Sequence, residues 1–309
     1  MDATDAANFI KACRDGNVDI VNYLLSNRYI DLNHVYHVEK VNYGFWYYCT
    51  ALTAACDFDR EEIVDILIKN GAKVNYTQNE FLKGINTPIY SSIHRKNYNI
   101  TKKLLESGVN VNFRDYYPHT HLPIHYAASS GFHEVIELLI LHGSDINSLT
   151  STLKHNILMQ TPLCIATCNN NIQTVRKLIS LGADVNFPSE PTGQIALDVA
   201  CNKQYFEIVK ILVEAGSNIN NISKSGITPL YRVIQRENAE IVKYLLDAGA
   251  DPTINNIYGE SMLNIVCIDD DEIEVDVPRE RLIIAGLLLN SILNIFKEEE
   301  PNFKYQRIK

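Results

Sequence analysis

Two groups of side chains in this sequence are of types that bind metal ions. Cys164 and Cys168 lie one helical turn apart, so both thiolates could reach a single zinc ion. A zinc site takes four ligands, and no second cysteine or histidine pair stands at ligand spacing. Two packed cysteines on one helix are the simpler interpretation, and a zinc site is the alternative.

Histidines form the second group, at positions 119, 121, 125 and 133. His125 and His133 fall at different places in a repeated pattern described below, which leaves only His119 and His121 together on one loop. Metal binding again stays an alternative, because a site needs more ligands than this pair. We expect no metal ion and no other cofactor.

The sequence has no motif of a known catalytic site. It contains no nucleophile elbow, glycine-rich phosphate loop, kinase signature or His-Glu-x-x-His motif. The acidic run Asp269–Glu272 could supply an acid/base pair, but a solvated connection between two helices is the simpler interpretation. We therefore expect a protein that is not an enzyme.

Composition restricts the partners and the compartment. The chain has 309 residues, of which 46% are hydrophobic and 21% charged, as in a folded soluble protein. A net charge of -9 repels nucleic acid, and no apolar run reaches the roughly 18 residues that a membrane span needs. Seven cysteines are too few for a disulfide framework. We expect reduced thiols and a cytoplasmic or nuclear location.

Single glycines recur along the chain at intervals of 33 to 39 residues. Each follows an apolar segment, as in Ser180-Leu181-Gly182-Ala183-Asp184-Val185-Asn186, where glycine can end a helix in the left-handed conformation. Such a spacing indicates one supersecondary unit used repeatedly. The glycines are Gly71, Gly108, Gly143, Gly182, Gly216 and Gly249.

Two helices are predicted in each unit. A threonine cap followed by proline opens the first, as at Thr87-Pro88, Thr161-Pro162 and Thr228-Pro229. The second carries an apolar stripe, as in the segment 241–246. These helices are antiparallel neighbours because the connection between them is short. We expect first helices to begin near Thr50, Thr87, Leu122, Thr161, Ile195, Thr228 and Ser261.

These residues resemble the ankyrin repeat, whose pattern is Gly-x-Thr-Pro-Leu-His-x-Ala-Ala followed by Gly-His-x-Glu-Ile-Val and Gly-Ala-Asp-Val-Asn. The resemblance implies an all-α ankyrin-repeat solenoid of about eight helix-turn-helix units, with projecting β-hairpin fingers. It would form a single domain over 1–309, with an N-terminal capping unit at 2–33, six repeats at 46–257 and an atypical C-terminal capping unit at 258–309. Cys13, Cys56, Cys201 and Cys267 then occupy the small, buried second-alanine position.

The motif histidine is kept only at His125. Elsewhere the same slot holds Thr53, Tyr90, Cys164, Asp198, Tyr231 and Asn264, so the usual threonine-to-histidine hydrogen bond is mostly lost. Tyr90 and Tyr231 either line the groove of the solenoid or are buried.

Four fingers are longer than the family minimum, at 35–49, 76–86, 113–121 and 148–160. Insertions of this kind gather on one face of a solenoid, and aromatic residues are enriched in interface hot spots. We expect them to contact a partner, with internal packing of the rings as the alternative. The predicted contacts are Tyr43, Phe45, Trp46, Tyr47 and Tyr48 of the first finger, and Tyr116, Tyr117, His119 and His121 of the third.

The resemblance adds a concave groove formed by the fingers and the exposed ends of the first helices. Phe58 and Arg95 are the predicted partner contacts there. The other groove positions are Asp57, His94, Ser129, Ser130, Cys168, Asn169, Asn202, Lys203, Gln235 and Arg236.

The predicted function is binding of a protein or an extended peptide by a monomeric adaptor or receptor. One alternative is a factor of a large DNA virus or intracellular microbe that blocks a host protein. Another is the substrate-recognition subunit of a ubiquitin ligase, in which the closing helix around Leu282–Leu289 would recruit a second protein instead of only capping the solenoid. The resemblance also implies hydroxylation of Asn186, eight residues after Leu178.

Overall fold

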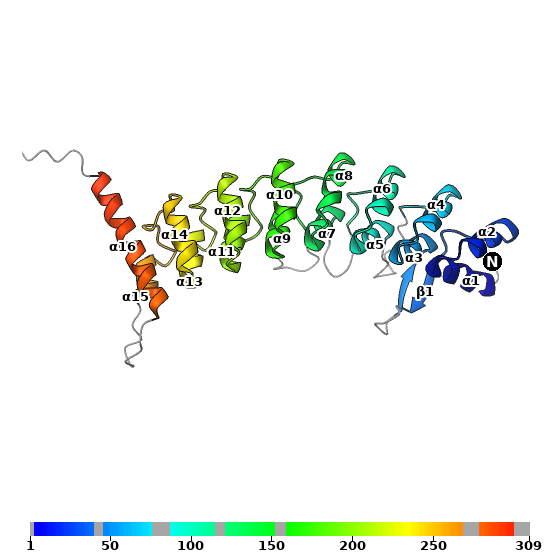
Figure 1. Cartoon of the computed structure of the whole chain (residues 1–309), viewed down its shortest axis with the longest axis horizontal. Helices are drawn as coiled ribbons and strands as arrows, with labels where there is room; N and C mark the ends of the chain where they lie inside the picture. Colours follow the sequence, from blue (N-terminus) through cyan, green and yellow to red (C-terminus); the bar gives the residue numbers. More distant parts are fainter. Residues whose placement is uncertain are drawn as a thin grey trace, which may run out of the picture. The chain divides into compact units, whose positions relative to one another are not determined.

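The computed structural model describes residues 3–39, 46–75, 87–114, 121–151, 159–267 and 278–299. Sixteen α-helices, one 3-10 helix and two strands lie within them, and the α-helices form eight consecutive pairs. The chain divides into two compact units, unit 1 with residues 1–157 and 180–182 and unit 2 with residues 158–179 and 183–309. Figure 1 labels the helices of each unit.

Each helix pair is named here by its first and second helix. Unit 1 contains α1 (Ala3–Asp15) and α2 (Val18–Asn27), α3 (Ala51–Asp57) and α4 (Glu61–Lys69), α5 (Pro88–Arg95) and α6 (Tyr98–Glu106), and α7 (Pro123–Ser130) and α8 (Ile136–Leu141), the last preceded by the 3-10 helix η1 (His133–Val135). Unit 2 contains α9 (Pro162–Cys168) and α10 (Ile172–Ser180), α11 (Ala196–Lys203) and α12 (Phe206–Glu214), α13 (Pro229–Gln235) and α14 (Ala239–Asp247), and α15 (Met262–Cys267) and α16 (Arg279–Glu299).

The first helices begin where the sequence predicts. Thr50, Thr161 and Thr228 cap α3, α9 and α13 by accepting a hydrogen bond from the backbone three residues later. Thr87, Leu122 and Ile195 are the caps of α5, α7 and α11. The expected helix starts are confirmed. They could be predicted because capping depends on residues within one turn of the helix start.

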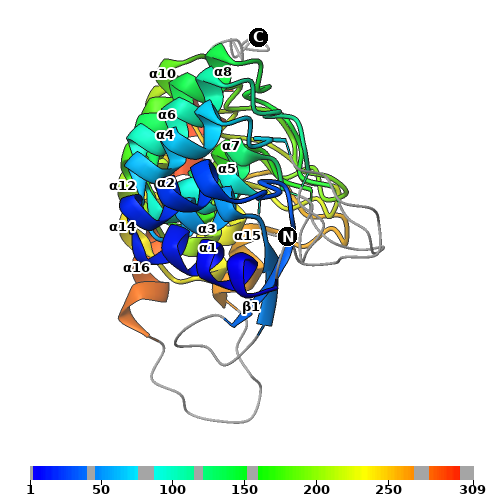
Figure 2. The same cartoon turned by 90° about the vertical axis from the view of Figure 1, so that its right-hand side faces the viewer.

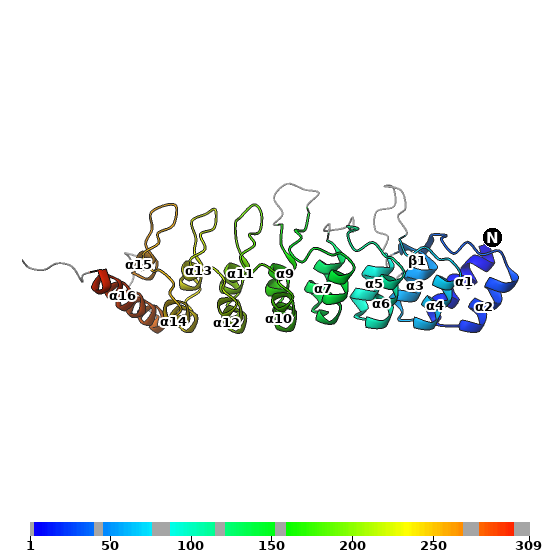
Figure 3. The ribbon, with the colours of Figure 1, turned by 90° about the horizontal axis from the view of Figure 1, so that it is seen from above.

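Helices of each unit lie in two rows. In unit 2, Figure 3 shows α9, α11 and α13 beside the fingers and α10, α12 and α14 in the second row. The end-on view of unit 1 in Figure 2 shows the same division, with α4, α6 and α8 outside α3, α5 and α7. First helices are almost wholly buried, as in α3, where all seven residues are buried, whereas second helices bury one stripe, such as Ile63, Val64 and Leu67 of α4.

The turn from first to second helix needs one residue in the left-handed conformation. Gly131 supplies it between α7 and α8 with φ of 75°. Five other turns place a residue with a side chain there, at a strain of order 1 kcal/mol each, offset by packing of the pair. Those residues are Asp59, Lys96, Asn170, Gln204 and Glu237.

Asparagine side chains join consecutive repeats. Asn75 donates to the carbonyl oxygen of Gly108 at 2.8 Å and accepts from the backbone of Asn110 at 2.6 Å. In unit 2, Asn186 donates to the carbonyl oxygen of Gly216 at 3.2 Å and accepts from the backbone of Asn218 at 2.7 Å. The side-chain amide of one repeat therefore both donates to and accepts from the backbone of the next repeat. This explains why asparagine recurs at the end of the motif.

One finger of unit 1 contains the two strands. β1 (Tyr36–Glu39) pairs antiparallel with β2 (Trp46–Cys49), with Tyr36 opposite Cys49 and Glu39 opposite Trp46. This hairpin and the paired helices confirm the predicted all-α solenoid fold with projecting β-hairpin fingers. None of the helices that the structure describes is long and apolar enough to cross a membrane.

Candidate partner-binding surface

In four repeats the residue in the histidine slot is hydrogen-bonded to the finger that follows it. In unit 1, Tyr90 is buried, and its hydroxyl lies 2.8 Å from the carbonyl oxygen of Phe113 and 2.6 Å from that of His121. Its ring packs edge-on against Tyr126, with the ring centres 4.7 Å apart. One hydroxyl therefore fixes both ends of the finger 113–121.

His125 holds the next finger in the same way, by a hydrogen bond to its backbone. The backbone N–H of Leu122 donates to its Nδ1 at 3.0 Å, so Nε2 carries the proton and donates to the carbonyl oxygen of Ser148 at 2.9 Å. The side chain is fully buried, and desolvation lowers its pKa to about 3. His125 is therefore a neutral structural residue and not a free metal ligand.

Unit 2 uses a carboxylate for this purpose. Asp198 accepts from the backbone of Ile195 at 2.9 Å and from the Asn221 side chain of the next finger at 2.7 Å. Its other oxygen lies 3.5 Å from the guanidinium of Arg232, and the two side chains are 0% and 11% exposed. Burial raises the pKa of Asp198, and the Ile195 backbone N–H, the Arg232 guanidinium and the Asn221 side chain oppose this rise by stabilising the charged carboxylate.

Tyr231 completes the series. Its buried hydroxyl donates to the Glu260 carboxylate at 3.2 Å and accepts from the Asn256 side chain at 3.0 Å. Asn256 in turn donates to Glu260 at 2.6 Å, and its Oδ1 accepts from the backbone of Tyr258 at 2.9 Å. The sequence left open whether Tyr90 and Tyr231 line the groove, and the structure shows both as buried supports of the fingers.

Large apolar side chains project from the fingers that unit 2 holds in this way. Tyr258 is 81% exposed, Ile257 60% and Ile222 57%. Their fingers turn at Gly226 and Gly259, each with a φ near 70 to 80° that favours glycine. A Cβ on Gly226 would lie 2.5 Å from the backbone nitrogen of Ile257, so neighbouring fingers touch backbone to backbone. These apolar side chains therefore stand on a rigid support.

A second part of the surface lies at the ends of the first helices. Arg95 is exposed, its Nε donates to the carbonyl oxygen of Asp57 in the preceding repeat, and its guanidinium lies 5.9 Å from the ring centre of Phe58. The structure therefore brings Phe58 and Arg95, both predicted contacts, into one cation–π pair.

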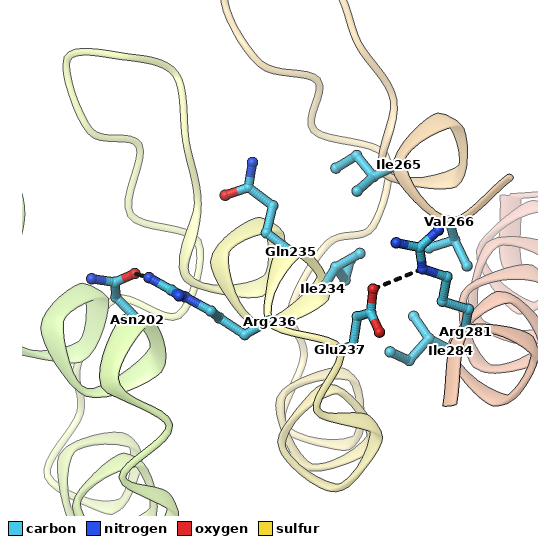
Figure 4. Close-up of a pocket in the computed structure, with 9 residues that line it drawn as sticks. All are labelled: Asn202, Ile234, Gln235, Arg236, Glu237, Ile265, Val266, Arg281 and Ile284. Carbon is cyan, nitrogen blue, oxygen red and sulfur yellow. Dashed lines mark hydrogen bonds and ion pairs between the residues drawn. The ribbon is translucent and has the colours of Figure 1, made fainter. Parts of the chain in front are cut away.

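In unit 2 the corresponding helix ends line an open pocket of about 370 Å³ (Figure 4). Arg236 donates to Asn202 at 3.0 Å, and Arg281 of α16 pairs with Glu237 at 2.7 Å. Apolar side chains surround the second pair in Figure 4. They are Ile234, Ile265, Val266 and Ile284. The pocket thus combines an apolar wall with charges of both signs.

The predicted site residues divide into three groups. Phe58, Arg95 and the half-buried His121 belong to the described surface, and Asn202, Gln235 and Arg236 line the pocket. Backbone positions alone are described for Trp46, Tyr47 and Tyr48 on β2. Outside the described residues lie Tyr43, Phe45, Tyr116, Tyr117, His119 and the acidic run 269–272.

Sequence reasoning missed the finger residues of unit 2. The predicted contacts came from the long fingers, whereas Ile222, Ile257 and Tyr258 lie on short ones. The signal that could have found them is a further glycine series at 193, 226 and 259, spaced by 33 residues, which marks the finger turns. Apolar residues next to such turns have no core to enter.

Five cysteines are part of the core, whereas Cys168 is half-buried and the side chain of Cys267 lies outside the described part of the chain. Cys13, Cys56 and Cys201 are buried as predicted, and burial raises the pKa of each thiol. Cys164 is also buried, with Ser189 Oγ 3.5 Å from its sulfur. Protonated, enclosed thiols are poor nucleophiles and poor ligands. Among the residues that the structure describes, no group of three histidine, cysteine or acidic side chains could hold a metal ion.

Comparison with known proteins supports the repeat assignment. The model of a family described as ankyrin repeats matches residues 5–78, 76–150, 124–223 and 163–256. The chain is 25% identical over 193 residues to the nuclear factor NF-kappa-B p105 subunit of Gallus gallus, covering 62% of this chain and 19% of the relative. It is 34% identical over 131 residues to an ankyrin repeat protein of fowlpox virus (strain NVSL), covering 42% of this chain and 37% of that protein. The chain therefore spans well under half of the length of these relatives.

A solved structure shares the fold. The ankyrin repeat domain of Bcl-3, a member of the IkappaB protein family, superimposes with a TM-score of 0.61 at 19% sequence identity. The match covers 77% of this chain and 97% of that domain.

Proposed function

Because the chain belongs to the ankyrin-repeat family, we propose that it is a non-catalytic receptor that binds a protein or an extended peptide through its fingers and the groove-side ends of its first helices. Ankyrin repeats are protein-interaction modules, so a protein partner follows from the family. The surface, the kind of partner and the absence of catalysis are the parts that we propose.

The main support for this proposal is the exposure of Tyr258 and Ile257. Both lie on a finger whose base is fixed by Tyr231, Asn256 and Glu260. Exposing a large aromatic side chain to water gives up the free energy that burial would supply, about 1.5 kcal/mol or more. Binding a partner recovers it, and a rigid support lowers the entropy lost on binding. The geometry therefore supports an anchor site at this finger.

The long finger of unit 1 supports the same function. Tyr90 holds Phe113 and His121, the two ends of the segment that carries Tyr116 and Tyr117. The β1–β2 hairpin carries Trp46, Tyr47 and Tyr48 on its second strand. We propose that these aromatic residues contact the partner, with Phe58 and Arg95 beside them along the groove.

Proximity labelling in the native cell identifies the partner, and calorimetry then tests the surface. We expect the pair Ile257→Ala and Tyr258→Ala to weaken binding by at least about 2 kcal/mol, and the pair Trp46→Ala and Tyr47→Ala to do likewise. Lys243→Ala, at an exposed position of α14 in the second row of helices, is the matched control with unchanged affinity. If both double variants keep their affinity and their circular dichroism spectrum, this surface is not the binding site.

A second candidate function is blockade of a host protein. The relative from fowlpox virus supports it, because that relative is named as an ankyrin repeat protein of a virus. The same surface would then occupy a host regulator inside an infected cell, in the cytoplasm or nucleus. Loss of the labelled partner's activity on addition of the purified chain, restored by the Ile257 and Tyr258 substitutions, would distinguish blockade from adaptor function.

A further inference from the structure

The closing helix α16 is apolar on two opposite faces. One face packs against α14 and α15, where Ile284 and Leu288 are 1% and 0% exposed. The other face presents Leu282, Leu289, Leu293 and Phe296 to solvent, with exposed fractions of 61, 49, 54 and 58%. Capping the last repeat requires only the first face. The second face is left exposed in the part of unit 2 that the structure describes.

The exposed side chains follow a heptad pattern. Leu282, Gly286, Leu289, Leu293 and Phe296 are spaced alternately by four and three residues, as in the seam of a coiled coil. The 15 residues from Leu282 to Phe296 contain no charged side chain. A stripe of this kind fits another apolar helix, and it offers nothing to a charged partner.

We propose that this stripe binds a second copy of the chain, with the two α16 helices antiparallel across a two-fold axis. The stripe is complementary to itself in that arrangement. A seam register centred between Gly286 and Leu289 sets Leu282 opposite Leu293 and Gly286 opposite Leu289 of the partner copy. A Cβ built on Gly286 meets nothing within 4 Å, so the facing leucine has room to enter.

Parallel pairing fits less well. It would set Gly286 against Gly286 and leave a void, and it would set Arg279 of one copy against the same charge of the other. The antiparallel register instead sets Arg279 opposite Phe296, a cation–π pair, and opposes the two helix dipoles favourably. The orientation of the pair therefore follows from the order of residues along one stripe.

The area is sufficient for a weak dimer. Burying the four exposed side chains and the neighbouring Ile283, 40% exposed, removes of order 1,000 Å² over both copies, at the lower limit of specific interfaces. We expect a micromolar dissociation constant. Pairing would replace the monomer expected from the sequence and would double the number of fingers available to one multivalent partner.

Sedimentation equilibrium of the full chain over about 1 to 100 µM tests the proposal. We expect a monomer–dimer equilibrium that Leu289→Lys shifts at least about 100-fold toward monomer. Asn294→Lys is the control, because it adds the same charge at an exposed position of α16 off the stripe. Circular dichroism and melting temperature show that both variants fold.

Cysteine cross-linking tests the orientation. A mixture of the Leu282→Cys and Leu293→Cys chains should give a disulfide-linked heterodimer on mild oxidation, and Leu282→Cys by itself should give none. Efficient linking of Leu282→Cys to itself would overturn the antiparallel arrangement. A chain that stays monomeric at 100 µM, or a Leu289→Lys variant that instead loses binding to lipid vesicles or to a different protein, would overturn the dimer.

Discussion

Unit 1 and unit 2 hold their fingers by different means. In unit 1, Tyr90 and His125 bind carbonyl oxygens of the finger backbone. In unit 2, Asp198 and Tyr231 bind side chains of the fingers, namely Asn221, Asn256 and Glu260. The slot in the first helix is the same, and its residue type changes with what the finger offers.

The difference shows that the motif histidine is one solution to a geometric requirement. Any side chain that reaches the next finger with a suitable donor or acceptor can fill the slot. A slot residue that bonds to the finger is called a clamp here. A backbone clamp, which bonds to carbonyl oxygens of the finger, tolerates any finger sequence and so suits the long fingers of unit 1. A side-chain clamp ties the finger to particular residues and permits buried charge, which makes the Asp198 clamp of unit 2 the one most sensitive to substitution.

Breaking the charged clamp should have the largest effect. Arg232→Met leaves the Asp198 carboxylate buried without its counter-ion, which should cost about 3–5 kcal/mol of unfolding free energy in urea. Burial already raises the pKa of Asp198 above its unfolded value, so the unfolded chain loses this proton first as pH rises. The loss should therefore grow as pH rises through the folded-state pKa of Asp198, which burial places above the ordinary carboxyl value. Adding Asp198→Asn should recover most of the stability, and a double variant as unstable as the single one would contradict this account.

Stacking of the fingers in unit 2 gives the next largest effect. Gly226→Ala should cost about 3 kcal/mol, because the residue has a φ of 71° and a Cβ would collide with the backbone of Ile257. Gly71→Ala is the matched control, since its φ is 90° and a Cβ there meets nothing within 4 Å. It should cost only about 1 kcal/mol. Equal losses for the two variants in thermal unfolding would show that neighbouring fingers do not touch.

The two tyrosine clamps allow a direct comparison. Tyr90→Phe should cost about 1–2 kcal/mol, because the carbonyl oxygens of Phe113 and His121 lose their shared donor. Tyr231→Phe should cost less than about 1 kcal/mol, since Asn256 and Glu260 remain bonded to each other. Urea titration of both variants measures the difference. The reverse order would mean that the side-chain clamp depends on its tyrosine.

The histidine clamp predicts an effect of another kind, a pH dependence of the free energy of unfolding. Its folded pKa of about 3 lies below the unfolded value of 6.5, so the unfolded chain binds a proton that the folded chain excludes. The contribution of neutral His125 to the free energy of unfolding is fully present above about pH 6.5. It decreases as pH falls toward 3, by about 1 kcal/mol between pH 6 and pH 5. Unfolding of the wild type and His125→Gln at pH 7, 6 and 5 should show a flatter profile for the variant. Parallel profiles would contradict the assignment.

Much of the fold was predictable because its signals are local. The glycine spacing gave the repeat, and capping residues such as Thr50, Thr161 and Thr228 gave the start of each first helix. The buried cysteines followed from their position in the repeat. Caps, turns and helical stripes depend on neighbours within a few residues, so they can be read from one chain.

The candidate site was less predictable. Aromatic residues looked alike in the sequence, yet Tyr258 is exposed on a short finger and Tyr90 of α5 is buried beneath a long one. Phe58 and Arg95 meet because two repeats stack, although 37 positions separate them. Exposure and pairing of this kind depend on which repeat lies next to which side chain.

The repeat, the helix pairs and the residue type in each slot follow from the order of amino acids, since they depend on helical period and capping. That slot residues as different as Tyr90, His125, Asp198 and Tyr231 perform one task becomes visible only in the folded chain. The tertiary structure also decided which apolar face of α16 covers the last repeat and which is left exposed. The physical reason is that a helical period fixes which residues share a face, whereas burial of that face depends on contacts between residues about 20 to 40 positions apart.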